Sequence, residues 1–378
     1  MKNNTLKQLG TLGQSIWLDY IRRDLVASGE LRRLIKEDGL RGMTSNPSIF
    51  EKAIASSHDY DEDILAMALK KKSVDEIYET ISQRDVQGAA DEFRALYDST
   101  DGKDGYVSLE VNPHLAYDTN GTLEEARRLW AALRRPNVFI KVPATANGLP
   151  AIQQLISEGI NVNVTLLFGL PRYRQVVEAY LNGIEERARQ GKAVKRVASV
   201  ASFFVSRIDA LIDPLLDTFI AQGGKEAEIA KKVRGQVAIA SAKMAFQIYK
   251  EIFCNDQFKK LAAQGALTQR LLWASTSTKN PEYSDVKYVE ALIGPDTVNT
   301  APLETIDAYR NHGEPKARIE QDVKEARWVL ERLPELGINL DSVTRQLEDE
   351  GVEKFNKPFD KLMETLAQRA LRHLVRKS

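Results

Sequence analysis

The chain has 378 residues, enough to bury a large core as one barrel-sized domain with additions or as two smaller domains. Its 53 Lys and Arg residues balance 53 Asp and Glu residues, which excludes a general electrostatic affinity for nucleic acid or for an acidic membrane surface. A single cysteine, Cys254, excludes an intramolecular disulfide and indicates a reducing, cytoplasmic location. Its apolar helical context predicts a buried structural thiol.

The sequence carries no pattern of a targeting segment, a metal site or a nucleotide site. Residues 1–10 are polar and lack the apolar core of a signal peptide, and no apolar run approaches the ~20 residues that span a bilayer. The four histidines are scattered without paired ligand spacing, and no Gly-rich phosphate loop is present. We therefore expect no metal and no cofactor, so that any chemistry comes from the protein's own side chains.

Strand-like and helix-like segments alternate through the first 312 residues. Strands are expected at residues 14–20, 39–45, 106–111, 138–144, 160–167, 196–205 and 270–276, with a weaker eighth candidate at 296–301. Helices are expected at residues 21–37, 47–97 in two or three pieces, 122–133, 150–158, 171–190, 209–263 with a break near 223–224, and 283–293. This alternation, without a dinucleotide fingerprint, predicts one closed (β/α)8 barrel of the TIM type, with helical insertions, over residues 1–312.

Local capping signals predict where three of the helices begin. Asn46 followed by Pro47 supplies an N-cap and a first-turn proline. Ser73 is expected to cap a second helix, and Thr122 with Glu125 three residues later predicts a capping box for a third.

The pattern changes after residue 312. Residues 313–378 form a separate segment, of which 315–378 read as almost wholly helical and rich in Glu, Lys and Arg, with breaks expected at Gly337 and at Lys357-Pro358. We interpret this segment as a helical extension packed on the barrel. A coiled-coil dimerisation arm is the alternative, but the apolar spacing is too irregular to favour it. The sequence leaves both a monomer and a homodimer open.

One lysine lies in the middle of the fourth expected strand. In an extended chain Val138, Ile140 and Val142 face one way, whereas Phe139 and Lys141 face the other. An ammonium group is costly in a low-dielectric interior, and such a setting suits chemistry that needs a neutral amine, such as Schiff-base formation with a carbonyl. The alternative is a strand-end lysine whose head reaches solvent.

Other strands also carry polar side chains at their C-terminal ends, where TIM-type barrels place their chemistry. On one parity of five strands these are Asp19; Thr44 and Asn46; Ser108 and Glu110; Asn161, Asn163 and Thr165; and Ser202, which is followed by Phe204 and Arg207. Each has a structural alternative, such as capping a helix or bonding to backbone. A shared polar rim nevertheless favours a ligand site, because buried polar groups that do not serve each other cost stability.

These side chains fit a Schiff-base reaction on a sugar. An amine that has attacked a ketone must lose water, and Glu110 with Thr165 could hold the catalytic water. Asp19 could take the proton from a sugar hydroxyl as a carbon–carbon bond breaks. The neutral polar groups suit polyol hydroxyls, and Arg207 offers a planar fork for a phosphate.

Four segments resemble transaldolase. They are TSNPS at 44–48, FIKVPAT at 139–145, GINVNVTLLF at 159–168 and SFFVSR at 202–207. The resemblance runs in order from about residue 12 to residue 312. With IWLDY at 16–20 and the charged C-terminal helices, the chain is similar to the longer bacterial subgroup, which is related to the transaldolase half of fusions with glucose-6-phosphate isomerase. At this length we expect no isomerase half.

The resemblance implies a class I, Schiff-base transferase of the pentose phosphate pathway. Such an enzyme moves a dihydroxyacetone unit from sedoheptulose 7-phosphate to glyceraldehyde 3-phosphate, giving erythrose 4-phosphate and fructose 6-phosphate. By position, Lys141 matches the Schiff-base lysine, Asp19 the acid–base carboxylate, and Glu110 and Thr165 the groups around the catalytic water. The positions that match substrate contacts are Thr44, Asn46, Asn163, Ser202, Phe204 and, for the phosphate, Arg207.

The chain departs from the family pattern at the phosphate site. Shorter members carry a second phosphate-binding arginine after the seventh strand, where this chain reads ASTSTK over residues 274–279. Ser275 and Lys279 are the expected substitutes. Ser206 also stands where the resemblance predicts a glycine before the arginine.

Two other functions fit the same residues, and in both the partners are small sugar phosphates. A class I aldolase would release free dihydroxyacetone, and it differs from a transferase in how well the enamine is shielded from water. A catalytically silent barrel would bind sugar phosphates or scaffold partners through its C-terminal helices. The joint presence of Lys141, Glu110 and Asp19 argues against the silent barrel.

Overall fold

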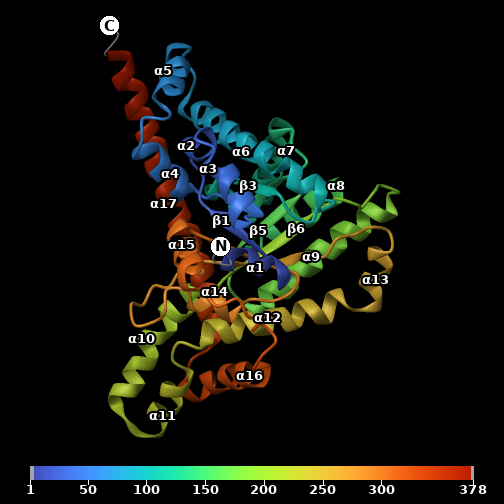
Figure 1. The fold of residues 1–378 in the computed structure, drawn as a ribbon, viewed down its shortest axis with the longest axis vertical. Coiled ribbons are helices and arrows are strands. Elements are labelled where there is room, and N and C mark those ends of the chain that lie inside the picture. Colours follow the sequence, from blue (N-terminus) through green and yellow to red (C-terminus); the bar gives the residue numbers. More distant parts are fainter. Residues whose placement is uncertain (1–3, 376–378) are drawn as a thin grey trace.

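Eight parallel strands close into a barrel in chain order in the computed structural model, which describes residues 4–375 (Figure 1). The strands are β1 (Gln14–Asp19), β2 (Gly42–Thr44), β3 (Tyr106–Glu110), β4 (Val138–Pro143), β5 (Val162–Leu167), β6 (Ser199–Phe204), β7 (Arg270–Ala274) and β8 (Thr297–Ala301). The barrel closes where β8 pairs with β1, from Gln14 opposite Thr297 to Leu18 opposite Ala301. The predicted (β/α)8 barrel is therefore confirmed, including its weaker eighth strand.

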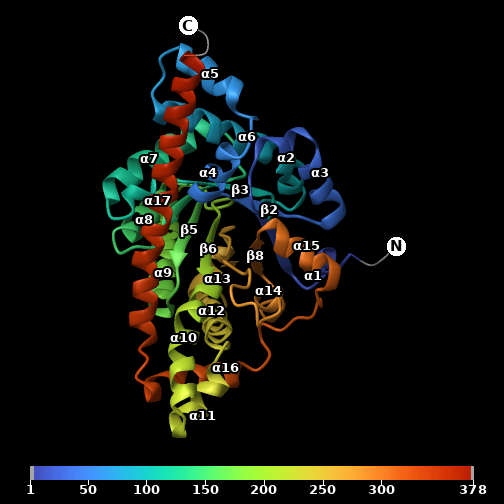
Figure 2. The same cartoon turned by 90° about the vertical axis from the view of Figure 1, so that its left-hand side faces the viewer.

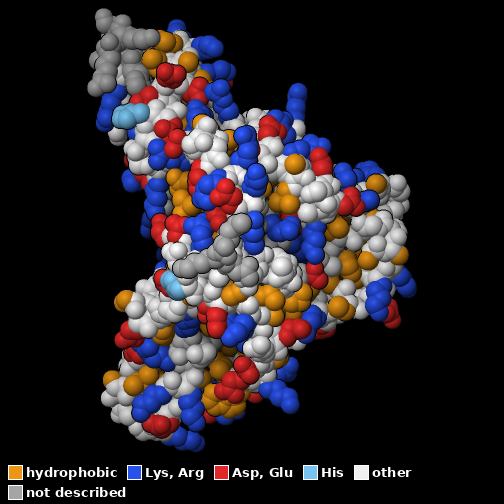
Figure 3. Space-filling model, in the orientation of Figure 1, with side chains coloured by type: hydrophobic (Ala, Val, Ile, Leu, Met, Phe, Trp, Pro, Cys, Tyr) orange, Lys and Arg blue, Asp and Glu red, His pale blue; other side chains and the backbone are white. Residues whose placement is uncertain are grey.

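Helices surround the barrel and extend beyond it. They are α1 (Thr5–Thr11), α2 (Arg23–Ala27), α3 (Glu30–Arg33), α4 (Pro47–Ala55), α5 (Asp61–Leu69), α6 (Val74–Ser99), α7 (Thr119–Leu133), α8 (Gly148–Glu158), α9 (Leu170–Arg189), α10 (Ser206–Gln222), α11 (Gly224–Val233), α12 (Val237–Phe253), α13 (Asp256–Ala262), α14 (Lys287–Ala291), α15 (Leu303–His312), α16 (Val323–Arg332) and α17 (Leu340–Val375). Lys, Arg, Asp and Glu side chains are interspersed over the face shown in Figure 3. Within residues 4–375, no helix combines the length and the apolarity that crossing a bilayer requires.

Two of the three predicted helix starts are confirmed. The Asn46 side chain accepts from the Ile49 N–H at 3.0 Å, and Ser73 forms a capping box at the start of α6. The start at Thr122 is wrong, because Asp118 caps α7 one turn earlier by accepting from a backbone N–H at 3.0 Å. The helix predicted over residues 21–37 is instead α2, α3 and a π-helical turn, because Gly29 at φ 81° interrupts it.

Helix α17 runs lengthwise along one side of the molecule, past the barrel (Figure 2). The predicted break at Gly337 is confirmed, with φ at 68°, but α16 begins later than residue 315. The predicted break at Lys357-Pro358 is wrong, since α17 continues through Pro358. A mid-helix proline loses one hydrogen bond at a cost of about 3 kcal/mol. Burial of Phe359 and Leu362 on the same helix offsets this cost.

The prediction of a buried Cys254 is also wrong. This residue follows the last residue of α12 and is exposed. Its neighbour Phe253 is 6% exposed and supplies the apolar contact at this point of the helix. Successive residues of a helix are turned by about 100°, so an apolar run does not bury each of its members.

An aromatic layer fills the barrel below its C-terminal mouth. Tyr106 of β3 stacks on Phe139 of β4 with ring centroids 4.3 Å apart, and Trp17 of β1 lies 6.1 Å from Phe139. Because β1 and β4 are not neighbours, this contact runs across the interior. Gly42 makes room for the indole, since a Cβ there would stand 2.5 Å from the Trp17 ring. The layer gives the site above it a rigid floor.

A buried ion network closes the opposite, N-terminal end of the barrel. Asp104 accepts from Ser15 Oγ at 2.7 Å, from Arg41 Nη1 at 2.9 Å and from Arg270 Nη2 at 3.0 Å. Burial by itself would raise the pKa of Asp104, but the charges of Arg270 and Arg41 and the Ser15 hydrogen bond outweigh it and hold the pKa below its ordinary value.

We expect Asp104→Asn to destabilise the fold strongly near neutral pH and much less in acid. The lower folded-state pKa makes Asp104 stabilising above the unfolded pKa, and this contribution is lost as pH falls through the folded pKa. Removing one partner of a buried ion pair costs about 3–5 kcal/mol. Urea unfolding at about pH 7 and about pH 3 measures the difference. An equal wild-type-to-variant difference at both pH values would contradict this account.

Candidate active site

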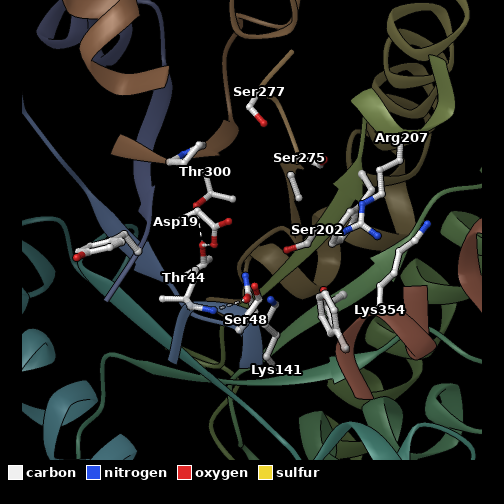
Figure 4. Close-up of a pocket in the computed structure, with 18 of the residues that line it drawn as sticks. Asp19, Thr44, Ser48, Lys141, Ser202, Arg207, Ser275, Ser277, Thr300 and Lys354 are labelled. Atoms are coloured by element: carbon white, nitrogen blue, oxygen red, sulfur yellow. Dashed lines mark hydrogen bonds between the residues drawn. The ribbon is translucent and has the colours of Figure 1, made fainter. Parts of the chain in front are cut away.

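A pocket of about 410 Å³ opens at the C-terminal ends of the barrel strands (Figure 4). Of the twelve side chains that the sequence predicts for a site, ten line it: Asp19, Thr44, Asn46, Lys141, Thr165, Ser202, Phe204, Arg207, Ser275 and Lys279. The other two, Glu110 and Asn163, are buried directly behind lining residues. The fold thus brings together side chains that lie as far apart along the chain as Asp19 and Lys279.

Lys141 extends from β4 into this pocket and is 4% exposed. Its Nζ donates to the Ser45 carbonyl at 3.1 Å and lies 3.5 Å from Glu110 Oε2. The alternation of β4 produces this placement, because Phe139 on the same parity belongs to the aromatic floor below. The alternative of a lysine whose head reaches bulk solvent is therefore excluded.

Glu110 is enclosed between the pocket and a second, smaller cavity. Burial raises the pKa of Glu110 to about 7, although the nearby Lys141 lowers it. The second cavity has a volume of about 30 Å³ and is lined in part by Glu110, Tyr78 and Phe359. Glu110 Oε1 and Thr165 Oγ1 are both buried without a protein hydrogen-bond partner. Buried polar atoms of this kind are suited to bind a water or a substrate atom.

Asp19 is the last residue of β1 and lines the same pocket as Lys141. Its Oδ1 accepts from Thr44 Oγ1 at 2.7 Å, and Thr44 Oγ1 also lies 2.7 Å from Thr300 Oγ1 of β8. The enclosing barrel mouth raises the pKa of Asp19, whereas the Lys141 charge and the Thr44 hydrogen bond lower it. The net shift is upward, which makes the carboxylate a stronger base.

A chain of neutral hydrogen bonds connects three strands beneath the pocket. Ser202 Oγ donates to Asn163 Oδ1 at 2.7 Å, and Asn163 Nδ2 donates to Ser108 Oγ at 3.1 Å. Asn161, which shares the parity of Asn163, lies outside the site. Its amide donates to the Pro136 carbonyl at 3.0 Å and its Oδ1 accepts from the Ala198 N–H at 2.9 Å, so that it ties strands together near their N-terminal ends.

Strand β5 is irregular beside Thr165. Its pairing with β6 shifts in register between Val164 and Leu167, and Leu166 adopts φ 56°. A left-handed conformation at a bulky residue is strained, and such strain concentrates at functional sites. The irregularity ends the alternation that the sequence predicts for this strand. Thr165 nevertheless remains in the pocket wall.

Basic side chains outnumber acidic ones around the pocket. Its lining includes five cations against two carboxylates: Lys52, Lys141, Arg207, Lys279 and Lys354 against Asp19 and Glu304. Burial lowers the pKa of Arg207, and burial together with the Arg207 charge lowers the pKa of Lys279. Burying the Arg207 and Lys279 charges without enough nearby negative charge is unfavourable. The site is therefore suited to an anionic ligand.

Ser275 and Lys279, the expected substitutes for a second phosphate-binding arginine, line the pocket together with Arg207. Ser275 has φ 54°, and its Oγ lies 3.1 Å from Ser206 Oγ at the start of α10. Lys279 Nζ donates to Ser277 Oγ at 2.7 Å. Figure 4 shows Ser275, Ser277 and Arg207 around one end of the pocket.

Twelve of the 22 lining residues were absent from the sequence prediction, among them Thr300, Lys52, Lys354 and Phe355. Thr300 is the next-to-last residue of β8, where the parity rule applied to the other strands identifies it. Lys52 comes from α4, and Lys354 and Phe355 come from α17. No local pattern marks these last three, because a helix position reveals a pocket contact only once the docking of the helix is known.

Among residues 4–375, no group of three or more His, Cys, Asp or Glu side chains is arranged to hold a metal ion. The pocket combines the buried amine of Lys141, the carboxylate of Asp19 and neutral hydrogen-bonding groups, with the Glu110 carboxylate buried beside the amine. This set can attack a carbonyl, move protons and bind hydroxyl groups.

Comparison with known proteins yields one family. The model of the Transaldolase/Fructose-6-phosphate aldolase family matches residues 16–366. A transaldolase of Trichodesmium erythraeum is 50% identical over 373 residues, which cover 98% of each chain. Transaldolase 2 of a Nostoc species is 48% identical over 97% of each chain, and a transaldolase of Saccharopolyspora erythraea is 45% identical over 97% of this chain and 98% of its own.

The match extends over the barrel and most of α17, and the relatives have nearly the same length as this chain. On these grounds the chain belongs to the transaldolase/fructose-6-phosphate aldolase family.

Proposed function

We propose that the protein is a transaldolase that transfers a dihydroxyacetone unit between sugar phosphates. The observation that carries this proposal is the buried Lys141 amine in a pocket flanked by Glu110 and Asp19. Relatives that share up to 50% of their residues over nearly the whole chain carry this name. The proposed donor is sedoheptulose 7-phosphate and the proposed acceptor is glyceraldehyde 3-phosphate, as in the pentose phosphate pathway.

The reaction begins when the lone pair of Lys141 Nζ attacks the ketose carbonyl carbon. Glu110 Oε2, 3.5 Å from Nζ, is placed to accept the proton that the amine gives up. The resulting carbinolamine loses water to form an iminium, and Glu110 with Thr165 is placed to hold that water. Both residues contribute a buried oxygen without a protein partner.

Carbon–carbon cleavage follows from the iminium. Asp19 removes the proton of the C4 hydroxyl, the C3–C4 bond breaks, and its electron pair moves into the iminium to give an enamine. The aldehyde product leaves. The enamine carbon then attacks the acceptor aldehyde, Asp19 returns its proton to the new hydroxyl, and water releases the product from Lys141.

The remaining residues are proposed to hold the substrate. Thr44, Asn46, Ser202 and, through Ser202, Asn163 offer neutral partners for hydroxyl groups. The phosphate would bind at the end of the pocket formed by Arg207, Ser275 and Lys279, which we call the cationic end. The Phe204 ring lies beside it, 5.6 Å from the Arg207 guanidinium carbon.

The experiment that tests the function is a product analysis. Purified protein with sedoheptulose 7-phosphate and glyceraldehyde 3-phosphate is expected to form erythrose 4-phosphate and fructose 6-phosphate in equal amounts. Mass spectrometry of the sugar phosphates measures both products. Release of free dihydroxyacetone at a rate that matches sugar turnover would instead identify an aldolase.

We expect Glu110→Gln to lower turnover by about 10²-fold or more and to remove one ionisation from the pH profile. Glu110 is a base only when ionised, so that the activity of the wild-type enzyme should fall as pH drops below its pKa of about 7. The glutamine variant should lack this acid limb. Turnover measured between about pH 5 and about pH 9 provides the test, and an unchanged limb in the variant would assign it to another group.

We also propose that residues 313–375 are an extension packed on a barrel domain in a cytoplasmic enzyme; the last three residues of the expected extension, 376–378, lie outside the described residues. Ion pairs support the packing: Arg172 Nε lies 3.1 Å from Glu348 Oε2, and Lys361 Nζ lies 2.8 Å from Glu51 Oε1. Each pair joins α17 to a barrel helix. Gel filtration with light scattering would decide between a monomer and a homodimer.

A further inference from the structure

The C-terminal helix places an aromatic ring over the reactive nitrogen. Lys141 Nζ lies 5.5 Å from the centroid of Phe355, which is 6% exposed and lines the pocket. The partners of Nζ at the barrel mouth are the carbonyl of Ser45, which directly follows β2, and Glu110, the last residue of β3. Phe355 is therefore the cover that α17 adds, whereas the polar groups belong to the barrel itself.

Contacts on both sides of Phe355 hold this part of α17 against the barrel. One turn earlier, a Cβ on Gly351 would stand 3.1 Å from Leu166 Cδ2, so that the helix backbone lies against the irregular part of β5. Arg172 pairs with Glu348 two turns before the ring, and Lys361 pairs with Glu51 after it. The ring is held in place by the packing of its helix.

The next residue toward the N-terminus, Lys354, marks the pocket edge. Figure 4 shows Lys354 on α17 beside Arg207, at the cationic end of the pocket. Its Nζ pairs with Glu350 Oε2 at 2.7 Å. Consecutive helix residues thus contribute a polar rim and an apolar cover, and the cover is the one that reaches Lys141.

Shielding of this nitrogen controls the fate of the enamine. In transfer, the enamine carbon attacks an acceptor aldehyde. In the competing path, the same carbon takes a proton from water, the iminium re-forms, water adds to its carbon, and the C–N bond breaks to give dihydroxyacetone and free Lys141. Neither path consumes an oxidant or a reductant. An apolar ring that excludes water from the enamine slows the second path.

We propose that Phe355 is the residue that makes this site a transferase, by covering the Lys141 enamine and keeping bulk water from it. The proposal rests on the Schiff-base function proposed above. It assigns the choice between transfer and release to the C-terminal helix, a segment outside the strands that carry the reacting groups.

The test compares the two fates of the enamine in one reaction. Fructose 6-phosphate and erythrose 4-phosphate are supplied, sedoheptulose 7-phosphate is measured by mass spectrometry, and free dihydroxyacetone is measured with NADH-coupled glycerol dehydrogenase. In Phe355→Ala the ratio of release to transfer should rise at least about tenfold. In D₂O the released dihydroxyacetone should carry one carbon-bound deuterium, which marks protonation of the enamine.

Two further variants separate the ring from the helix. Phe355→Leu keeps an apolar cover and should raise the ratio by an intermediate amount. Leu362→Ala removes a fully buried side chain of the same helix that does not line the pocket, and it should leave the ratio as in the wild type. An equal rise in Leu362→Ala would overturn the proposal, since the effect would belong to helix docking.

Borohydride trapping with fructose 6-phosphate accompanies each assay. It shows whether a negative result contradicts the Schiff-base function or only the shielding role of Phe355. If the wild-type protein forms no adduct on Lys141, the proposed function itself is wrong. If the adduct forms and the ratio in Phe355→Ala stays at the wild-type value, the shielding role alone is wrong. Should Phe355→Ala fail to fold, an unchanged ratio in Phe355→Leu would be decisive in the same way.

Discussion

Replacement of Lys141 by alanine is expected to abolish both transfer and covalent capture of the substrate. With fructose 6-phosphate and borohydride, the wild-type protein should gain a reduced three-carbon unit on Lys141, as seen by peptide mass spectrometry. The Lys141→Ala protein should gain none. Its turnover should fall by at least on the order of 10⁴-fold, because the covalent path is proposed to run through the Lys141 amine, the lining lysine that lies beside Glu110.

A second buried lysine provides the control. Lys243 of α12 is 8% exposed and donates to the Gln321 carbonyl at 2.7 Å, and burial lowers its pKa. It has no place in the pocket lining. Lys243→Met should therefore keep both the adduct and the transfer activity. A Lys141→Ala protein that still acquires the adduct would show that the nucleophile is another residue.

Replacement of Asp19 by alanine is expected to stop the reaction after Schiff-base formation. The variant keeps Lys141 and Glu110, so that the iminium can still form. It lacks the base for the C4 hydroxyl, and loss of such a group lowers turnover by about 10²–10⁴-fold. Borohydride should therefore trap the whole six-carbon ketose phosphate on Lys141, in place of the three-carbon unit.

The mass of the trapped adduct makes this prediction specific. A folding defect or a loss of substrate binding would remove both adducts, whereas a lost cleavage step exchanges one for the other. Thr44→Val is a matched comparison, because it removes the hydroxyl that donates to Asp19 Oδ1 at 2.7 Å but retains the carboxylate. It should lower turnover less than Asp19→Ala. Three-carbon labelling at the wild-type rate in Asp19→Ala would refute the assigned role.

The active-site geometry has a consequence for the energetics of the fold. A site with several cations and a buried carboxylate whose pKa is raised to about 7 costs stability. The aromatic layer of Trp17, Tyr106 and Phe139 lies directly below it. The Asp104 network closes the far end of the barrel. Rigid packing of these lower layers allows the mouth to keep unpaired polar atoms for a substrate.

The barrel and most of the polar wall of the site could be predicted from the sequence. Strand–helix alternation depends on local patterns, and side-chain parity within a strand depends on backbone geometry, so that Lys141, Glu110 and Asp19 could be assigned to one face without coordinates. The same rule failed for Asn161, which has the parity of Asn163 but lies near the other end of its strand, where it bonds to backbone.

The residues that cover the pocket could be identified only in the folded structure. Phe355 reads in the sequence as an ordinary apolar position, and Pro358 reads as a helix break, yet α17 stays continuous and brings Phe355 to 5.5 Å from the Lys141 nitrogen. Local signals cannot reveal this, because the position of a helix depends on contacts with residues far away in the chain, such as Leu166 and Arg172. Alternation along a strand is a local property, whereas the docking of α17 depends on the packing of the whole barrel.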